Sequence, residues 1–225
     1  VSTQARDWPS WRGDVAGSGI APDTKVPLRW SKDRNVKWRT ELPSRGNSTP
    51  VVWGDKVFVT QVVEKDNFRS LMCFHRKTGK LLWQKGVKYT ERERSHGTNP
   101  YCSASPVTDG KRVIVTFASA GVFCYDMDGK LLWQRGLGKQ DHTWGNASSP
   151  VLYKDLCILY HGPGNGAFLI GLDKFKGKTV WKFNEPKWNT RGRTDGFQGN
   201  EEKGIVGSFS TPIIVKAGGR DELIM

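Results

Sequence analysis

"TGKLLWQKG" at residues 78–86 returns nearly unchanged as "DGKLLWQRG" at 128–136, and a third copy, "KGKTVWKFN", follows at 176–184. The tryptophans of the three copies are 50 and then 48 residues apart. Periods of about 40–50 residues are typical of solenoids and propellers, in which one small unit buries its faces only against its neighbours. The chain is therefore a repeat protein, and the nine-residue motif marks one place in each unit.

A second motif runs in step with the first. It reads "STPVVWGDKVFVT" at 48–60, "SASPVTDGKRVIVT" at 103–116, "SSPVLYKDLCILY" at 148–160 and "STPIIVKAGGRDELIM" at 210–225. Short apolar runs such as "VFVT" predict buried strands, and "GD", "DG" and "TGK" predict tight turns between them. The strands of the first unit are expected at about 49–53, 56–63, 68–75 and 80–86. Four antiparallel strands in a unit of this length favour a propeller blade over a solenoid rung.

The tryptophan motif predicts how one blade contacts the next. A buried aromatic side chain of this size removes roughly 150–250 Å² from water, and glycine at the preceding turn permits a positive φ. The residues expected to dock neighbouring blades are Trp38, Trp83, Trp133 and Trp181, with the turn glycines Gly79, Gly129 and Gly177.

The charge of the chain limits the classes of partner. The 225 residues carry a formal net charge of +13, which can indicate a polyanion partner. The basic residues are scattered rather than blocked, so a solvated basic surface is the preferred interpretation. No nucleic-acid-binding motif and no run of 18 apolar residues occurs, so we expect no nucleic-acid partner and no membrane span.

Four cysteines stand at positions 73, 102, 124 and 157, and none forms a C-x-x-C pair. Zinc binding and thioredoxin-like chemistry are therefore disfavoured. Cys73 and Cys124 precede their repeat tryptophans by ten and nine residues, which places them at nearly equivalent positions. We expect buried thiols on strands, and disulfides remain an alternative if the protein is exported.

These motifs resemble the pyrroloquinoline-quinone-type β-propeller repeat, whose docking motif is close to "A-x-D-x-x-T-G-K-x-x-W". The matching stretches are "CFHRKTGKLLW" (73–83), "CYDMDGKLLW" (124–133) and "GLDKFKGKTVW" (171–181). Asp126 and Asp173 hold the acidic position, and His75 replaces it in the first copy. The stretches "WPSWRGDVAGSG" (8–19) and "LRWSKDRNVKWRTELP" (28–43) look like the entry to exported bacterial members. The resemblance implies an exported protein of the bacterial periplasm or cell envelope.

The resemblance also implies the architecture, an all-β fold that is a β-propeller of four-stranded antiparallel blades. Members commonly have seven or eight blades, so about half of a propeller is present, and remaining blades or a second copy would close the ring. Residues 1–34 are expected to form an N-terminal extension packing on the propeller, and 35–225 to form the repeats. Their expected parts are an outer strand at 35–42, suited to completing the last blade, blades at about 48–87, 103–137 and 148–185, and a partial blade at 210–225.

Binding residues are expected in the loops from the outer strand of one blade to the inner strand of the next, because these loops gather around the channel. The expected ligand or partner face comprises Arg45, Asn47, His96, Asn99, Tyr101, His142, Trp144, Asn146, Arg191 and Arg193. The histidines are candidate ligands or proton-transfer groups. Trp144 is a candidate for stacking on a planar ligand or for covering the channel mouth. The two later arginines are candidates for binding a carboxylate or phosphate. Solvated loop side chains remain the alternative for the histidines and arginines.

Three functions stay open. The resemblance to the propeller lipoprotein of outer-membrane β-barrel assembly implies an exported, non-catalytic module that binds or scaffolds a protein partner or small ligand through these loops. We expect this function, with no catalytic or metal-binding residue assigned. A sensor or accessory domain is a second possibility.

The third is a quinoprotein-type alcohol or sugar dehydrogenase. The resemblance implies that such an enzyme holds pyrroloquinoline quinone in the channel beside Ca²⁺, while an aspartate takes the alcohol proton. Those enzymes carry adjacent cysteines beside the quinone, and this chain has no Cys-Cys pair. Calcium needs several converging oxygen ligands. Asp141, Asn146, Asp195 and Glu201 are candidates, although no spacing marks them as a set.

Overall fold

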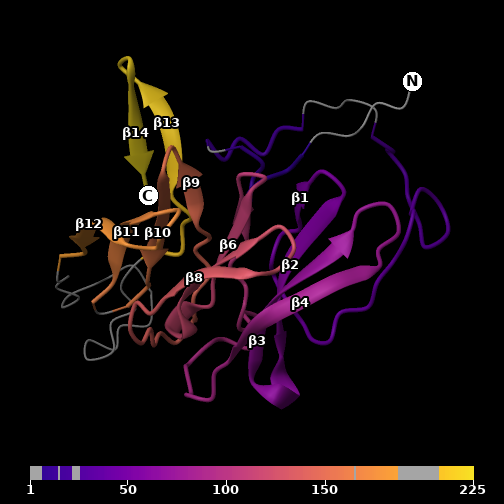
Figure 1. The fold of residues 1–225 in the computed structure, drawn as a ribbon, viewed down its shortest axis with the longest axis horizontal. Helices are drawn as coiled ribbons and strands as arrows, with labels where there is room; N and C mark the ends of the chain where they lie inside the picture. The colour runs from indigo at the N-terminus through magenta and orange to yellow at the C-terminus, as the bar shows by residue number, and fades with distance from the viewer. Residues whose placement is uncertain (1–6, 15, 22–25, 165, 187–207) are drawn as a thin grey trace, which may run out of the picture.

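Strands dominate the fold. The computed structural model describes residues 7–14, 16–21, 26–164, 166–186 and 208–225. In this part of the chain, three four-stranded sheets and one hairpin follow each other in chain order. Figure 1 shows the succession, from the indigo and purple first sheet at the right to the orange third sheet at the left, with the yellow hairpin above it. The arrangement is that of a partial β-propeller.

Each sheet is an antiparallel meander of strands taken in sequence order. The first contains β1 (Val51–Trp53), β2 (Lys56–Val63), β3 (Phe68–His75) and β4 (Leu81–Lys88). The second contains β5 (Val107–Thr108), β6 (Arg112–Thr116), β7 (Val122–Asp126) and β8 (Leu131–Arg135). The third contains β9 (Val151–Tyr153), β10 (Leu156–His161), β11 (Phe168–Asp173) and β12 (Thr179–Asn184), and the hairpin contains β13 (Ile213–Ala217) and β14 (Arg220–Ile224). The strands of the first unit agree with the sequence-based expectation within two residues.

The hydrophobic cores lie between neighbouring sheets. Alternate residues of a strand point to opposite faces, so Val113 of β6 packs towards the first sheet with Phe58 and Leu71. Its neighbour Ile114 packs towards the third sheet with Leu159. The middle strands of the second sheet, β6 and β7, are apolar on both faces because this sheet lies between the first and the third, and no unit buries its own faces alone.

The repeated tryptophan docks one unit on the next. Trp133 of β8 donates from Nε1 to the carbonyl oxygen of Lys174 at 3.0 Å, and a Cβ atom at Gly177 would lie 2.6 Å from its ring. Gly177 has φ +67°, so this turn needs glycine both for its backbone and for the closeness of the indole. The same relationship joins Trp38 to Arg76 O (2.7 Å) and Gly79, and Trp83 to Met127 O (3.2 Å) and Gly129. Trp181 has the equivalent ladder position, opposite Gly171.

The segment 35–42, expected as an outer strand, is unpaired among the described residues. Residues 36–42 carry no strand assignment, and no described sheet pairs with them. A strand needs a neighbour to receive its backbone hydrogen bonds, and that neighbour is absent from the described part of the chain. The segment still packs on the first unit, because Thr40 Oγ1 donates to the carbonyl oxygen of Gly79 at 2.8 Å.

The N-terminal segment crosses the first strands of successive units. Trp8 exchanges two 2.8 Å backbone hydrogen bonds with Val52 of β1, and Pro9 accepts one from the amide of Thr108 at the end of β5. These contacts lie near the β1–β2 and β5–β6 turns, at the end of the sheets opposite the loops that join one unit to the next.

The four cysteines are buried and free. The disulfide alternative is therefore wrong for this structure. Burial raises the pKa of the Cys73 and Cys124 thiols to about 12, which leaves them protonated and unreactive at neutral pH. Among the described residues, no helix has the length and apolar character needed to cross a membrane.

Candidate functional site

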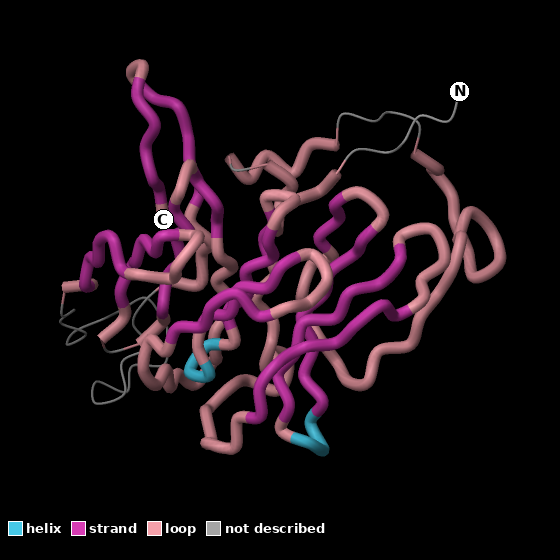
Figure 2. The backbone as a smooth tube through the Cα atoms, viewed as in Figure 1, coloured by secondary structure: helices cyan, strands magenta, loops and turns pink. Residues whose placement is uncertain are grey.

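The loops between units gather at one end of the sheets, here called the loop face. It comprises residues 43–50, 89–106 and 136–150 and two short 3-10 turns, η1 (Glu64–Asp66) and η2 (Ala118–Ala120). Both turns appear in cyan in the lower half of Figure 2. The Ser119 hydroxyl donates to the carbonyl oxygen of Gln140 at 3.0 Å. The β6–β7 turn and the loop after β8 therefore meet at this end.

An ion pair joins the two loops. The amide of Arg94 donates to Asp141 Oδ1 at 2.9 Å, and Arg94 Nε lies 3.2 Å from both carboxylate oxygens. The amide hydrogen bond, aided by the guanidinium, holds the pKa of Asp141 below its usual value. Exposed pairs of this kind contribute little to stability, so the main effect is to fix the register of one loop against the other.

An amide side chain and a ring contact complete this junction. Asn99 Nδ2 donates to the carbonyl oxygen of Trp144 at 2.6 Å, and Asn47 Nδ2 donates to that of Thr98 at 2.9 Å. The rings of His96 and Trp144 lie 4.7 Å apart. Three loops therefore present one continuous surface, which we name the loop-face patch: Asn47, Arg94, His96, Asn99 and Trp144.

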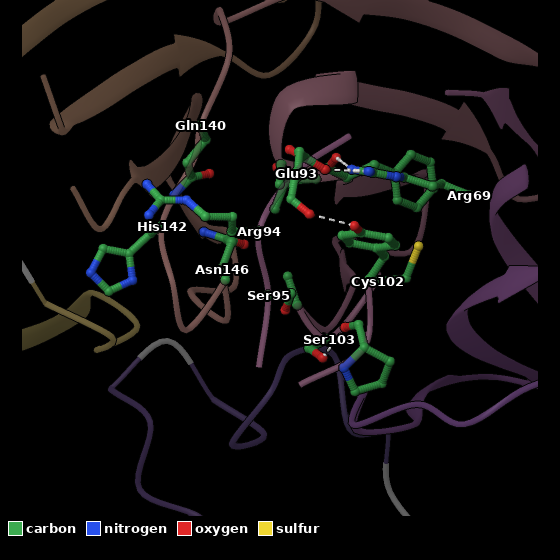
Figure 3. Close-up of a pocket in the computed structure, with 16 residues that line it drawn as sticks. Arg69, Glu93, Arg94, Ser95, Cys102, Ser103, Gln140, His142 and Asn146 are labelled. Carbon is green, nitrogen blue, oxygen red and sulfur yellow. Dashed lines mark hydrogen bonds and ion pairs between the residues drawn. The ribbon is translucent and has the colours of Figure 1, made fainter. Parts of the chain in front are cut away.

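A buried ion pair lies beneath the first loop. Arg69, at the start of β3, pairs with Glu93 and donates to the carbonyl oxygen of Phe117 at 2.8 Å; each charged side chain is less than 5% exposed. The guanidinium lies between the rings of Tyr89 and Tyr101, 4.5 and 4.4 Å from their centres. Figure 3 shows the pair on one side of the pocket and His142, Arg94 and Asn146 on the other. Arg69 thus fixes the path of the loop that carries the patch.

The space among these residues is small. The cavity lined by Arg69, Glu93, Gln140 and Asn146 has a volume of about 20 Å³, which is enough for a single water molecule. Its polar lining suits a water, because the side-chain oxygen of Gln140 has no partner among the described residues. The centre of the loop face is therefore a packed junction.

His142 is buried beside this cavity. Its Nδ1 accepts from the amide of Trp144 at 3.1 Å, so the ring proton is on Nε2, which has no partner among the described residues. Burial lowers the pKa of His142, and Arg94 lowers it further. In Figure 3 the ring points away from the Arg69–Glu93 pair. The centres of the His142 and Phe209 rings lie 5.5 Å apart.

The expected site residues fall into those that form the patch, those that turn inward, one that is exposed elsewhere, and those outside the described part of the chain. Asn47, His96, Asn99 and Trp144 come together in the loop-face patch, and Asn146 joins them through its backbone, which accepts from Asn99 Nδ2 at 3.3 Å. Tyr101 turns inward, where its hydroxyl donates to the carbonyl oxygen of Glu93 at 2.6 Å. His142 is buried, and Arg45 is exposed while its carbonyl oxygen accepts from Gln61 at 3.2 Å. Arg191 and Arg193 lie outside the described residues.

The one-water cavity and the residues beside it do not fit a quinone with calcium. A cavity that holds one water cannot admit a tricyclic cofactor. The Asp141 carboxylate is committed to Arg94, and Asn146 Nδ2 donates to the carbonyl oxygen of Gly162 at 2.7 Å. No group of three His, Cys, Asp or Glu residues in the described part of the chain could hold a metal. The remaining calcium candidates, Asp195 and Glu201, lie outside that part.

Sequence reasoning missed Arg69, Glu93 and Arg94. One signal was available for Arg69, because a charged residue interrupts the apolar β3 run "FRSLMCFH". Glu93 and Arg94 belong to "ERER", which reads as a solvated charge run. The fold instead buries Glu93 and leaves Arg94 exposed. This difference can be predicted only when the positions of their partners are known.

Comparison with known proteins places the chain among proteins of this kind. The family described as outer membrane protein assembly factor BamB matches residues 29–161 and, in a second alignment, 67–197. A polyvinylalcohol dehydrogenase from Pseudomonas sp. is 22% identical over 189 residues, which are 78% of this chain and 28% of that protein. The chain therefore spans less than a third of that curated relative.

Solved structures agree on the fold. The quinohemoprotein alcohol dehydrogenase ADHIIG from Pseudomonas putida HK5 has a TM-score of 0.58 at 15% identity, over 85% of this chain and 28% of that one. The quinohemoprotein alcohol dehydrogenase from Comamonas testosteroni has a TM-score of 0.59 at 18% identity, over 86% of this chain and 30% of that one. The family match covers most of the chain, and the blades keep the register of the repeat. The chain therefore belongs to the pyrroloquinoline-quinone-like propeller repeats described as outer membrane protein assembly factor BamB.

Proposed function

We propose that the chain is part of an exported, non-catalytic propeller that binds a protein partner through the loop-face patch. The observation that carries this proposal is the joining of three loops into one surface by Arg94–Asp141, Asn99–Trp144 and Asn47–Thr98. A surface that is ordered before binding loses less conformational entropy when the partner arrives.

The chemistry of the patch supports a protein partner. Tryptophan and arginine are the residues most enriched among those that dominate interface energetics. The patch combines Arg94 and Trp144 with His96, and the side chain of Arg94 is 54% exposed. Membership of a family described as an outer membrane protein assembly factor also supports a role in the cell envelope, as does the N-terminal resemblance to exported members.

The test is capture of envelope proteins by the immobilised chain, followed by affinity measurement with the purified captured protein. We expect His96→Ala and Trp144→Ala to weaken binding at least tenfold while the melting temperature stays near that of the wild type. Trp30→Ala is the matched control, because Trp30 is 71% exposed and belongs to the N-terminal extension. Equal binding by the wild type and both patch variants would contradict the proposal.

A quinoprotein dehydrogenase is the second candidate, supported by the 22% identity to a polyvinylalcohol dehydrogenase. Titration with pyrroloquinoline quinone and Ca²⁺, followed by tryptophan fluorescence, separates the two functions. The binding-module proposal expects no saturable quenching and no dye reduction with polyvinyl alcohol. Saturable quenching with one quinone per chain, together with dye reduction, would favour the dehydrogenase.

A further inference from the structure

A second hollow opens on the loop face. Its volume is about 330 Å³, and it shares Arg69 and Tyr101 with the one-water cavity. Its walls come from the end of β2, η1 and the loop after β4. We name it the tyrosine cleft, and its principal residues are Val62, Glu64, Asn67, Tyr89, Arg92 and Tyr101. Small-molecule sites in proteins begin at about 300 Å³, so this hollow has the size of a binding site.

The floor and walls of the cleft are fixed by internal contacts. Val62 and Arg69 are each 2% exposed, and the Arg69 guanidinium is held between the rings of Tyr89 and Tyr101. The amide of Tyr89 donates to the carbonyl oxygen of Asn67 at 2.8 Å, which ties the two walls together. The cleft is therefore formed without a ligand.

The rim carries polar groups without partners. The side chains of Glu64, Asn67 and Arg92 are exposed and line the cleft, and among the described residues they take part in no hydrogen bond or ion pair. The two opposite charges have not paired with each other. A carboxylate accepts hydrogen bonds, a guanidinium donates them and an amide does both. The rim thus offers both kinds of hydrogen-bonding group to one ligand.

We propose that the tyrosine cleft binds a neutral polyhydroxylated ligand, a sugar or short oligosaccharide. A hydroxyl group donates and accepts at once, which suits a rim that offers both functions. The carboxylates of Glu64 and Glu91 would repel a simple anion, and the guanidinium of Arg92 would repel a simple cation. The half-buried aromatic wall of Tyr89 and Tyr101 suits the C–H faces of a sugar ring.

This site is separate from the loop-face patch and does not depend on the proposed partner. None of the five patch residues lines the cleft. The two sites can therefore be tested in the same protein with different variants.

Saturation-transfer NMR and calorimetric titration of the whole chain with maltotriose and cellotriose test the proposal. We expect saturable binding of at least one of the two trisaccharides in the millimolar range. Asn67→Gly keeps the left-handed backbone of Asn67, whose φ is +48°, while removing its amide. This variant and Glu64→Ala are each expected to weaken binding about tenfold, as the loss of one or two hydrogen bonds predicts.

The control variant is Trp144→Ala, which should leave sugar binding unchanged while weakening partner capture. The absence of saturable binding by either trisaccharide would overturn the proposal. Full binding by folded Asn67→Gly and Glu64→Ala variants would also overturn it, as would preferential binding of trigalacturonate or of a chitosan trimer. If Trp144→Ala loses partner capture but keeps sugar binding, the patch binds the partner and the cleft binds the sugar independently. The two proposals can therefore fail separately.

Discussion

The backbone amide of Ser105 donates to the hydroxyl oxygen of Ser149 at 2.9 Å, and so links the inner parts of two neighbouring units. The amide of Thr49 donates to Ser105 Oγ at 2.8 Å, and the amide of Ser149 donates to Thr211 Oγ1 at 3.0 Å. All four residues stand directly before the proline of the second sequence motif. The repeated Ser/Thr-Pro pair therefore builds a chain of amide-to-hydroxyl hydrogen bonds across four units.

Ser105→Ala should break this chain. The partly buried Thr49 amide loses its acceptor. Because an unsatisfied buried donor costs about 1–3 kcal/mol of the free energy of unfolding, we expect a loss near the lower end of that range. Urea denaturation measures the loss. Ser103→Ala is the control, because the Ser103 hydroxyl bonds only to Pro100 O within its own loop. A loss for Ser105→Ala no larger than that of Ser103→Ala would show that the inter-unit bond does not stabilise the fold.

Gly129→Ala should destabilise the junction of the first two units. Gly129 has φ +86°, and a Cβ atom there would lie 2.8 Å from the Trp83 ring. Gly54→Ala is the matched control, because Gly54 has φ +55° and nothing within 4 Å of its Cβ position. Backbone strain alone should cost about 1–2 kcal/mol in the control, and the clash should add about 1–3 kcal/mol in Gly129→Ala. Equal losses in thermal melting would exclude a role for the Trp83 contact.

Trp133→Ala should be more damaging than the Gly54→Ala control. Trp133 is 9% exposed and packs between the second and third sheets with Cys157 and Leu172. Truncating a large buried aromatic side chain costs about 3–5 kcal/mol. Trp30→Ala, at a 71% exposed position, should change the unfolding midpoint little. A near-normal midpoint for Trp133→Ala would argue against docking by this residue.

Much of the fold could be predicted because the repeat fixes local structure. In each unit the tryptophan follows the turn glycine by four residues. It therefore takes the same place in the strand pairing of both units, where Cys73 pairs with Trp83 and Cys124 with Trp133. The outer strand expected at 35–42 stays a prediction, because the described residues contain no neighbouring strand with which it could pair. Its sequence resembles an outer strand, but a strand also requires a neighbour.

Less of the candidate site could be predicted, because its contacts join distant segments. The loop-face residues His96, Asn99 and Trp144 were expected on one face, and the structure brings them into contact. The pairing of Arg69 with Glu93 spans 24 residues and joins β3 to the loop after β4. Neither periodicity nor local composition reveals such a partner.

The Arg69–Glu93 pair predicts a strongly coupled pair of mutations. Removing one member of a buried ion pair leaves a charge without its partner, which costs about 3–5 kcal/mol. Arg69→Met keeps an unbranched side chain between the two tyrosine rings, and Glu93→Gln keeps the shape of the carboxylate. We expect each single variant to lose stability in urea by this amount. The double variant should lose clearly less than the sum, and additive losses would contradict the pairing.

His161 predicts that the folded state weakens as pH falls. The residue is 5% exposed, and its ring nitrogen Nε2 donates to the carbonyl oxygen of Gly138 at 3.2 Å. Burial, with a smaller effect of Lys182, lowers the pKa of His161 from 6.5 to about 4. Between these two values the unfolded chain binds a proton that the folded chain does not. The free energy of unfolding should therefore fall as pH drops from about 6.5 to about 4, by about 3 kcal/mol in total.

Urea titrations at a series of pH values measure this slope. In His161→Gln the histidine is absent from both states, so the part of the slope that comes from His161 should disappear. His142 contributes in the same direction, because its pKa is also lowered by burial, and a smaller slope should therefore remain. The His96→Gln variant, changed at an exposed position, controls for the number of histidines. An unchanged slope in His161→Gln would mean that the buried ring takes up its proton without opening the third sheet.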